Sequence, residues 1–208
     1  MSGPPRAGAH PIEVESYAIL RARLDVCDLP PLCRAVVERI VHTTADVSWA
    51  GELVCDEAAL RAGQAALRAG APLVTDVRMV AAGITTHPSI VALDLAAGPA
   101  APGDTRSAAG MREAVRRHPV GAVWAIGNAP TALAALVEAA AAGLVTAPLV
   151  VGLPVGFVGA VAAKAALRAS GLGAVSSRTE RGGAAVAAAA VNALLYTPDP
   201  AESPGEPS

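Results

Sequence analysis

The sequence predicts an α/β protein: a single domain with a mostly parallel sheet and helices on both faces. Short apolar runs alternate with alanine-rich stretches of helical length along most of the 208 residues. The apolar runs are continuous, which is typical of parallel strands that are buried on both faces. A chain of this length supports one domain with a substantial core. Because crossovers between parallel strands are almost always right-handed, right-handed connections are expected here.

The first expected helix covers residues 32–41. Asp28 is a candidate cap, and Pro30 and Pro31 suit a first helical turn. The apolar residues at 32, 36 and 40 then recur at helical spacing. An edge strand is expected next, at 52–55.

The remaining elements follow from the same alternation. Strands are expected in the apolar runs at 73–77, 90–95, 122–126, 149–153 and 174–177. Helices are expected in the alanine-rich stretches at 57–69, 105–117, 131–142, 158–169 and 184–195. Asn128 or Thr131 is suited to cap the helix at 131–142. Residues 98–103 are predicted to form a loop.

Both ends of the chain are predicted to be disordered. Residues 1–9 are rich in glycine and proline, and residues 197–208 carry four prolines among acidic and small residues. The folded domain is therefore expected to cover residues 10–196.

Composition argues against several classes of partner. The net charge is −2 without a long run of either sign, and there are only two tryptophans, two tyrosines and one phenylalanine. A nucleic-acid partner is therefore not expected. The apolar stretch 132–153 is interrupted by Glu138 and Pro148, which favours a helix, a turn and a strand over a membrane span.

The cysteines and the N-terminus indicate a compartment. Cys27, Cys33 and Cys55 match neither a CxxC motif nor a zinc-ligand spacing, so we expect buried thiols in a reducing environment. Residues 1–10 lack the apolar core of a signal peptide. The sequence thus predicts a cytoplasmic protein without membrane contact.

Glycine-rich turns follow several of the predicted strands. They lie at 127–131, 152–159 and 178–183, and each precedes a predicted helix. Ligands of such sheets bind beyond the carboxyl ends of the strands, where backbone N–H groups suit anions. No GxxxxGK[ST] or GxGxxG pattern is present, so the signal for a nucleotide is poor. The glycines alone equally fit tight turns and close helix packing.

His42 is the candidate catalytic residue. Arg39 precedes it by one helical turn, so a cation and a titratable imidazole share one face of the helix. Such a pair can hold an anion and exchange a proton with it near neutral pH. In the last turn of the helix, the helix dipole would favour protonated His42. An ordinary structural histidine is the alternative interpretation.

The other histidines are weaker candidates. His10 lies in the expected N-terminal tail, and His87 and His118 each precede a proline in a loop or at a helix end. These histidines and the cysteines have no metal-ligand spacing, so no metal site is expected.

Several motifs, in order along the chain, resemble the precorrin-8X methylmutase family. The likeness runs from about residue 10 to residue 195, nearly the whole ordered chain. It is carried by Arg39-Ile-Val-His42-Thr-Thr-Ala-Asp46, Thr75-Asp-Val-Arg-Met-Val-Ala-Ala-Gly-Ile84, Gly127-Asn-Ala-Pro-Thr-Ala-Leu133, Pro154-Val-Gly-Phe-Val-Gly-Ala160, Arg181-Gly-Gly and Asn192-Ala-Leu194. Each motif alone is weak, whereas the ordered set is specific.

The resemblance implies a homodimeric enzyme of cobalamin biosynthesis that acts on a tetrapyrrole, precorrin-8X, and needs no cofactor. The reaction moves a methyl group from C-11 to C-12 of the corrinoid ring and yields hydrogenobyrinic acid. A histidine that corresponds to His42 is thought to protonate the macrocycle. Residues that correspond to Ser16 and Arg39 help to hold the substrate. Both the metal-free and the cobalt-containing substrate fit these motifs.

The sequence departs from the family pattern in three places. The segment Glu15-Ser16-Tyr17 replaces Arg-Ser-Phe, so the usual basic residue is missing. Ala163-Lys164-Ala165 replaces Ser-Lys-Glu, and Gly182-Gly183-Ala184 replaces Gly-Gly-Ser. These changes affect peripheral contacts and leave the proposed acid in place.

Other side chains are candidates for the anionic acetate and propionate rim of such a substrate. Asn128, Arg78 and the glycine-turn amides are expected to add donors to those of Arg39 and Ser16. Met79 is expected to offer an apolar contact to the macrocycle. Each has an ordinary alternative: Arg78 as a solvated or ion-paired side chain, with Asp76 or Asp46 as its partner, and Met79 as a core residue.

Two further side-chain roles and two other functions stay open. Asp46 and Thr43–Thr44 are candidates to orient His42. The chain would alternatively be a non-catalytic carrier that passes a corrinoid between enzymes. A third alternative is an ordinary nucleotide or sugar-phosphate enzyme, which nucleotides would stabilise against heat.

Overall fold

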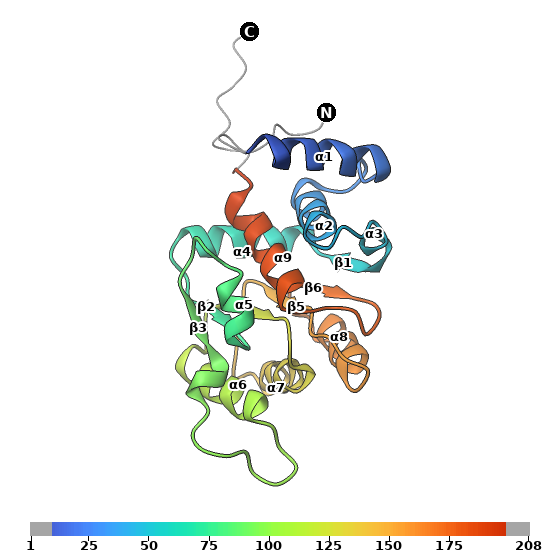
Figure 1. Ribbon diagram of the computed structural model, residues 1–208. Coiled ribbons are helices and arrows are strands. Elements are labelled where there is room, and N and C mark those ends of the chain that lie inside the picture. Colours follow the sequence, from blue (N-terminus) through green and yellow to red (C-terminus); the bar gives the residue numbers. More distant parts are fainter. Residues whose placement is uncertain (1–9, 199–208) are drawn as a thin grey trace.

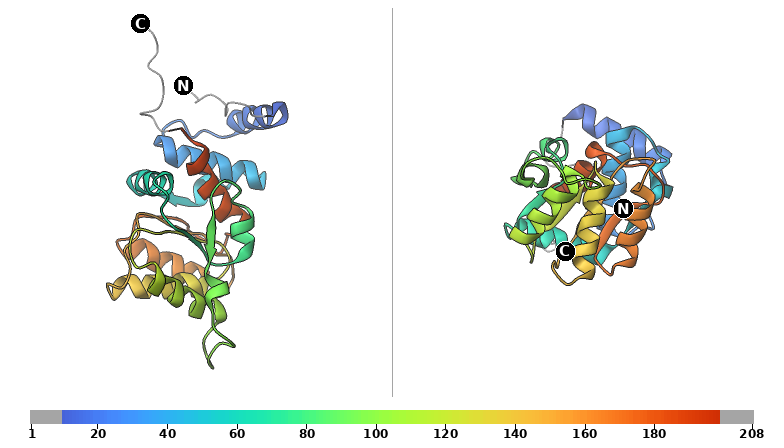
Figure 2. Two further views of the ribbon diagram at one scale, coloured as in Figure 1. Left: turned by 90° about the vertical axis from the view of Figure 1, so that its left-hand side faces the viewer. Right: turned by 90° about the horizontal axis from the view of Figure 1, so that it is seen from below.

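The computed structural model describes residues 10–198. They form three layers, with a central sheet between two layers of helices (Figures 1 and 2). The strands are β1 (Leu53–Cys55), β2 (Leu73–Thr75), β3 (Ser89–Val91), β4 (Val123–Ile126), β5 (Val150–Gly152) and β6 (Ala174–Ser177). The helices are α1 (Pro11–Arg23), α2 (Pro31–Thr44), α3 (Trp49–Glu52), α4 (Glu57–Arg68), α5 (Arg78–Ala82), the 3-10 helix η1 (Ala92–Leu95), α6 (Arg106–Arg117), α7 (Pro130–Ala141), α8 (Ala160–Ala169) and α9 (Ala184–Tyr196).

The strand order is β1-β6-β5-β4-β2-β3, and all neighbours are parallel except β1 and β6. The antiparallel strand is the predicted edge strand, where Val54 pairs with Ser176. The predicted fold class, a mostly parallel sheet within one α/β domain, is confirmed.

The strands are buried on both faces because their side chains alternate between two cores. Leu73 and Val123 pack in the core under α2, α4 and α9, whereas Val74 and Trp124 pack in the core over α6, α7 and α8. The three helices α6, α7 and α8 lie together below the sheet in Figure 1. Continuous apolar strands in the sequence are therefore explained by helices on both sides.

Helix α1 lies outside these three layers, across α2 (Figure 1). Leu20 is its one buried residue among those described. Helix α1 is not predicted from the sequence, because its apolar residues do not form a helical stripe. The short helices α3 and α5 are not predicted either, and the strand predicted at β3 extends into residues that form η1.

Two predicted helix caps are wrong. Asp28 does not cap α2; instead the carboxylate of Glu57 accepts hydrogen bonds from the N–H groups of Leu32 and Cys33. Neither Asn128 nor Thr131 caps α7, which begins after Ala129 without a side-chain cap of its own. In both places an acidic residue from another element supplies the acceptor.

For α7 that acceptor is Asp76, which follows β2. Its carboxylate accepts hydrogen bonds from the N–H groups of Gly127, Asn128 and Ala129 at 3.1, 2.8 and 2.8 Å. The side chain is buried, and burial raises the pKa of Asp76 although the three N–H donors lower it. Asp76 thereby ties the carboxyl ends of β2 and β4 together.

Residues 1–9 and 199–208, where disorder is expected, lie outside the described part of the chain. Thr197, which the sequence analysis assigned to the C-terminal tail, belongs to the fold. Its carbonyl oxygen accepts hydrogen bonds from Gln64 Nε2 at 2.9 Å and Arg68 Nη2 at 2.8 Å. Within residues 10–198, no helix combines the length and the apolar character that crossing a bilayer requires.

Removal of the Asp76 carboxylate should destabilise the protein strongly. We expect Asp76→Ala to lower the free energy of unfolding by about 3 kcal/mol, because buried N–H groups lose their acceptor. The matched control is Asp94→Ala, which removes a more exposed partner of Arg78 and should cost no more than about 1 kcal/mol. Urea unfolding measures both. Equal losses would contradict the special role of Asp76.

Candidate active site

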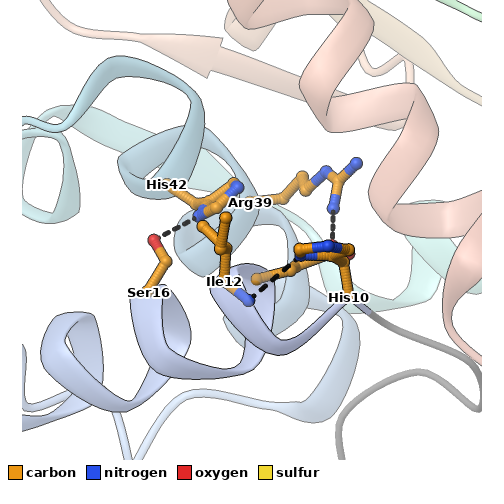
Figure 3. A pocket seen from close by; sticks show the side chains of 6 residues that line it. His10, Ile12, Ser16, Arg39 and His42 are labelled. Atoms are coloured by element: carbon orange, nitrogen blue, oxygen red, sulfur yellow. Dashed lines mark hydrogen bonds and ion pairs between the residues drawn. The ribbon is translucent and has the colours of Figure 1, made fainter.

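Helices α1 and α2 meet at a hollow that contains the predicted catalytic residue. The hollow has a volume of about 470 Å³ and is lined by His10, Ile12, Glu13, Ser16, Arg39 and His42 (Figure 3). Ligand sites commonly have volumes of roughly 300–1,000 Å³. Three residues singled out from the sequence, namely Ser16, Arg39 and His42, are thus brought together.

His42 lies in the last turn of α2, and two contacts from α1 hold its imidazole. Nδ1 is 2.9 Å from Ser16 Oγ. The ring of Tyr17 stacks on the imidazole, with 4.8 Å between the ring centroids and an interplanar angle of 14°. Within residues 10–198 no hydrogen bond engages Nε2. That nitrogen is therefore the one left for proton exchange with a ligand.

Burial and charge set the proton affinity of His42. Burial lowers its pKa from the ordinary value, and the nearby Arg39 guanidinium lowers it further, while Glu13 opposes the shift. The helix dipole, which was expected to favour the protonated form, is outweighed by desolvation. Protonated His42 is consequently a stronger acid than an exposed imidazolium.

Arg39 is surrounded by groups from α1 and α9. Its Nη1 donates to Glu13 Oε1 at 3.1 Å and to the hydroxyl of Tyr17 at 3.4 Å. Its guanidinium lies over the ring of Tyr196, 5.2 Å from the ring centroid. An anion that binds to Arg39 must therefore compete with the Glu13 carboxylate.

The predicted orienting residues of His42 are wrong. Thr43 and Thr44 donate their hydroxyl hydrogens to carbonyl oxygens one helical turn back in α2. Asp46 pairs with Arg181 and Ser48. Ser16, expected to bind substrate, is the residue that hydrogen-bonds to the imidazole.

His10 is a second correction. Predicted to lie in a flexible tail, it is instead the N-cap of α1 and accepts a hydrogen bond from the backbone N–H of Ile12 at 3.3 Å. It also lines the hollow (Figure 3). The pattern His10-Pro11 in fact marks a helix start, since proline is favoured in the first turn.

The other predicted binding residues, Arg78, Met79 and Asn128, do not line this hollow. Arg78 forms an ion pair with Asp94, at 2.8 Å, rather than with Asp76 or Asp46. Met79 is 61% exposed and so is not a core residue. Asn128 is partly buried, and its backbone N–H is used by Asp76.

Several of the glycine-turn amides predicted to bind anions have internal partners. In the first turn, Asp76 takes the N–H groups of residues 127–129. The N–H of Gly156 donates to Glu180 O at 3.1 Å, and that of Gly183 donates to Leu153 O at 2.9 Å. These amides are therefore engaged within the protein, whereas anion binding by the remaining amides of the turns stays a prediction.

Sequence reasoning also missed side chains that complete the site. Glu13 and Tyr17 from α1 contact Arg39, and Tyr17 contacts His42 as well. The one available signal was sequence spacing: Glu13 lies one helical turn before both Ser16 and Tyr17, and a predicted α1 would have placed the three on neighbouring positions of one face. Within residues 10–198, no group of three or more His, Cys, Asp or Glu side chains is arranged to hold a metal ion.

The pKa of His42 can be tested directly. We expect its imidazole to titrate below pH 6.5, because burial and Arg39 both disfavour the charged form. NMR titration of the Cε1 proton measures this, with the urea-unfolded chain as reference. Arg39→Gln removes the neighbouring charge and should move the titration upward. A downward move of the titration in Arg39→Gln, or none, would contradict the contribution assigned to the Arg39 charge.

Comparison with known proteins identifies the family. A model of the precorrin-8X methylmutase family matches residues 11–197. The chain is 41% identical over 191 residues to a precorrin-8X methylmutase of Pseudomonas aeruginosa, and the match covers 86% of this chain and 91% of that protein. It is 38% identical over 200 residues to a cobalt-precorrin-8 methylmutase of Methanothermobacter thermautotrophicus, covering 94% and 96% of the two chains.

A solved structure agrees with this match. The crystal structure of a precorrin-8X methylmutase from Thermus thermophilus superposes with a TM-score of 0.80 at 34% identity, covering 89% of this chain and 96% of that chain. The resemblance noted from the sequence motifs is confirmed. The chain belongs to the precorrin-8X methylmutase family, isomerases of cobalamin biosynthesis.

Proposed function

We propose that the chain moves a methyl group from C-11 to C-12 of precorrin-8X or cobalt-precorrin-8, with His42 as the general acid. The products would be hydrogenobyrinic acid and cobyrinic acid, respectively. The observation that carries the proposal is the state of the His42 imidazole: Nδ1 is held by Ser16, and Nε2 has no described hydrogen bond beside the hollow.

The reaction asks little of the protein beyond positioning and one proton. The substrate and product are isomers, so no group is added and none leaves. His42 Nε2 gives a proton to the conjugated ring system, the methyl group migrates to the neighbouring carbon, and the proton returns to His42. A well-placed general acid contributes about 10²–10⁴-fold to such a rate. The lowered pKa of His42 strengthens it as a donor.

The anionic rim of the substrate requires cationic and polar partners. Arg39 beside the hollow suits one acetate or propionate group, because a guanidinium forms charge-assisted hydrogen bonds with carboxylates. Ser16 would both hold the His42 imidazole and contact the substrate. Contacts of Arg78, Met79 and Asn128 with the macrocycle stay predictions, as they lie outside the hollow that supports this proposal.

The other predicted properties stay predictions. A homodimer would give a partner surface to Phe157 and Val158, which are 94% and 89% exposed in the single chain. The cytoplasmic location and the lack of a nucleic-acid partner rest on the sequence alone. A nucleotide or sugar-phosphate enzyme has less support, since Asp76 occupies the N–H groups before α7 that a phosphate would use.

Replacement of His42 tests the proposal. We expect His42→Ala to lose at least about 10²-fold in conversion while it still binds the pigment. The absorption change of metal-free and cobalt-containing precursor measures turnover and also shows which substrate is used. The matched control is His87→Ala, which removes an exposed histidine bonded to Pro88 O. Normal turnover by His42→Ala would refute the assignment, and binding without any spectral change by the unaltered protein would indicate a carrier.

Glu13 should weaken substrate binding, because its carboxylate occupies Arg39 and repels an anionic ligand. We expect Glu13→Gln to lower KM about fivefold, equivalent to roughly 1 kcal/mol of binding free energy. Steady-state kinetics measure the change. Glu15→Gln is the control, since Glu15 also lies on α1 but does not contact Arg39. A raised KM for Glu13→Gln would mean that Glu13 chiefly holds Arg39 in place.

A further inference from the structure

Tyr17 contacts both of the residues on which the proposed function depends. Its ring stacks on the imidazole of His42, with 4.8 Å between the centroids. Its hydroxyl oxygen accepts a hydrogen bond from Arg39 Nη1 at 3.4 Å. The side chain is partly buried between α1 and α2. One side chain thus links the proton donor to the cation that would hold the substrate.

The ring supplies a constraint that Ser16 alone cannot supply. A single hydrogen bond to Nδ1 holds one atom of the imidazole but still lets the ring turn about that atom. A stacked neighbour at an interplanar angle of 14° holds the plane of the ring as well. Both contacts together determine the direction in which Nε2 points. Proton transfer depends strongly on such alignment.

The hydroxyl acts on Arg39 instead. Nη1 of Arg39 donates to Glu13 and to Tyr17, both on α1. When a substrate carboxylate displaces Glu13, the Tyr17 hydroxyl is the α1 contact that still locates the guanidinium. Burial raises the pKa of Tyr17, so the phenol keeps its proton and can donate it to the same carboxylate.

We propose that Tyr17 is a positioning residue with two separable parts: its ring sets the plane of His42, and its hydroxyl sets Arg39 and contacts a substrate carboxylate. The proposal rests on the proposed function, because it assigns these parts to proton transfer and to substrate binding. Loss of the ring should therefore appear in kcat, and loss of the hydroxyl alone should appear in KM.

Two substitutions separate the parts. Tyr17→Phe keeps the ring and removes the hydroxyl, so we expect KM to rise about fivefold with kcat within about twofold of the unaltered protein. Tyr17→Ala removes both, so we expect the same rise in KM and a fall in kcat of about tenfold or more. Equal kcat losses in both variants, or unchanged kcat in Tyr17→Ala, would overturn the proposal.

Leu20→Ala is the control for mere loosening of α1. It truncates the buried apolar residue of the same helix, and the hydrogen bonds and ring contacts of His42 and Arg39 do not involve it. If Leu20→Ala reproduced the kinetics of Tyr17→Ala, Tyr17 would only anchor the helix, and the proposal would fail. Circular dichroism and thermal unfolding of all three variants establish that they fold.

An NMR readout tests the ring without any turnover. The Cε1 proton of His42 should lose its ring-current shift in Tyr17→Ala and keep it in Tyr17→Phe. In Tyr17→Ala the pKa of the His42 imidazole should also rise, because water reaches the ring. The charged residues that face the imidazole, Arg39 and Glu13, are both still present in this variant. His10, which also lines the hollow, must be assigned separately. An unchanged His42 signal in Tyr17→Ala would contradict the stacking role.

The turnover and NMR measurements distinguish a failure of the proposed function from a failure of the proposal for Tyr17. If the unaltered protein converts no precursor but the His42 signal responds to Tyr17→Ala as expected, the proposed function fails and the ring's hold on His42 stands. If conversion proceeds and the signal does not respond, the proposal for Tyr17 fails and the proposed function stands.

Discussion

The candidate site depends on the polar contact between α1 and α2. Helix α1 buries a single apolar residue among those described, so apolar packing contributes little to its position. Arg21 instead forms a forked ion pair with Glu38, whose side chain is only 8% exposed, at 2.8 Å between Nη2 and Oε2. Together with the Glu13–Arg39 and Ser16–His42 contacts, that pair holds α1 against α2 and places Ser16 and Tyr17 beside His42. The wall of the hollow is thus held by charge rather than by hydrophobic area.

This arrangement gives the same residues a structural and a chemical role. Arg39 joins α1 to α2 through Glu13, and it also lowers the pKa of His42. A ligand carboxylate that takes Glu13's place would keep the positive charge neutralised and leave α1 bound through Arg21 and Glu38. Buried charges that lose a partner are costly, so an anionic ligand is favoured over an empty site once Glu13 has moved. Under the proposed function, substrate binding and the docking of α1 on α2 would therefore be coupled through the Arg39 guanidinium.

Features that depend on local sequence could be predicted, whereas contacts between distant segments could not. The strands were predictable because continuous apolar runs have few alternatives, and His42 and Arg39 were predictable as neighbours because helical spacing is a local rule. Ser16 and His42 are separated by 26 residues, as are Glu13 and Arg39. Periodicity does not report contacts between two helices whose mutual orientation is unknown. Helix α1 itself escaped prediction because it lacks the apolar stripe on which such predictions depend.

The same limit applies to the glycine-rich turns, whose amides were predicted to bind anions. The chain leaves β2 toward β3 and leaves β4 toward β5, in opposite directions, and such a switch point usually opens a ligand crevice. Here the Asp76 carboxylate fills the N–H cradle between β2 and β4. Nearby, buried Lys164 donates to Arg181 O at 2.8 Å and closes the turn before α9. These paired amides and carbonyls stabilise the sheet edge. Among the described residues, the charged, partly open groups around His42 lie one layer away, between α1 and α2, where the Arg39 guanidinium pairs with the Glu13 carboxylate. In the proposed function, a substrate carboxylate would take the place of Glu13.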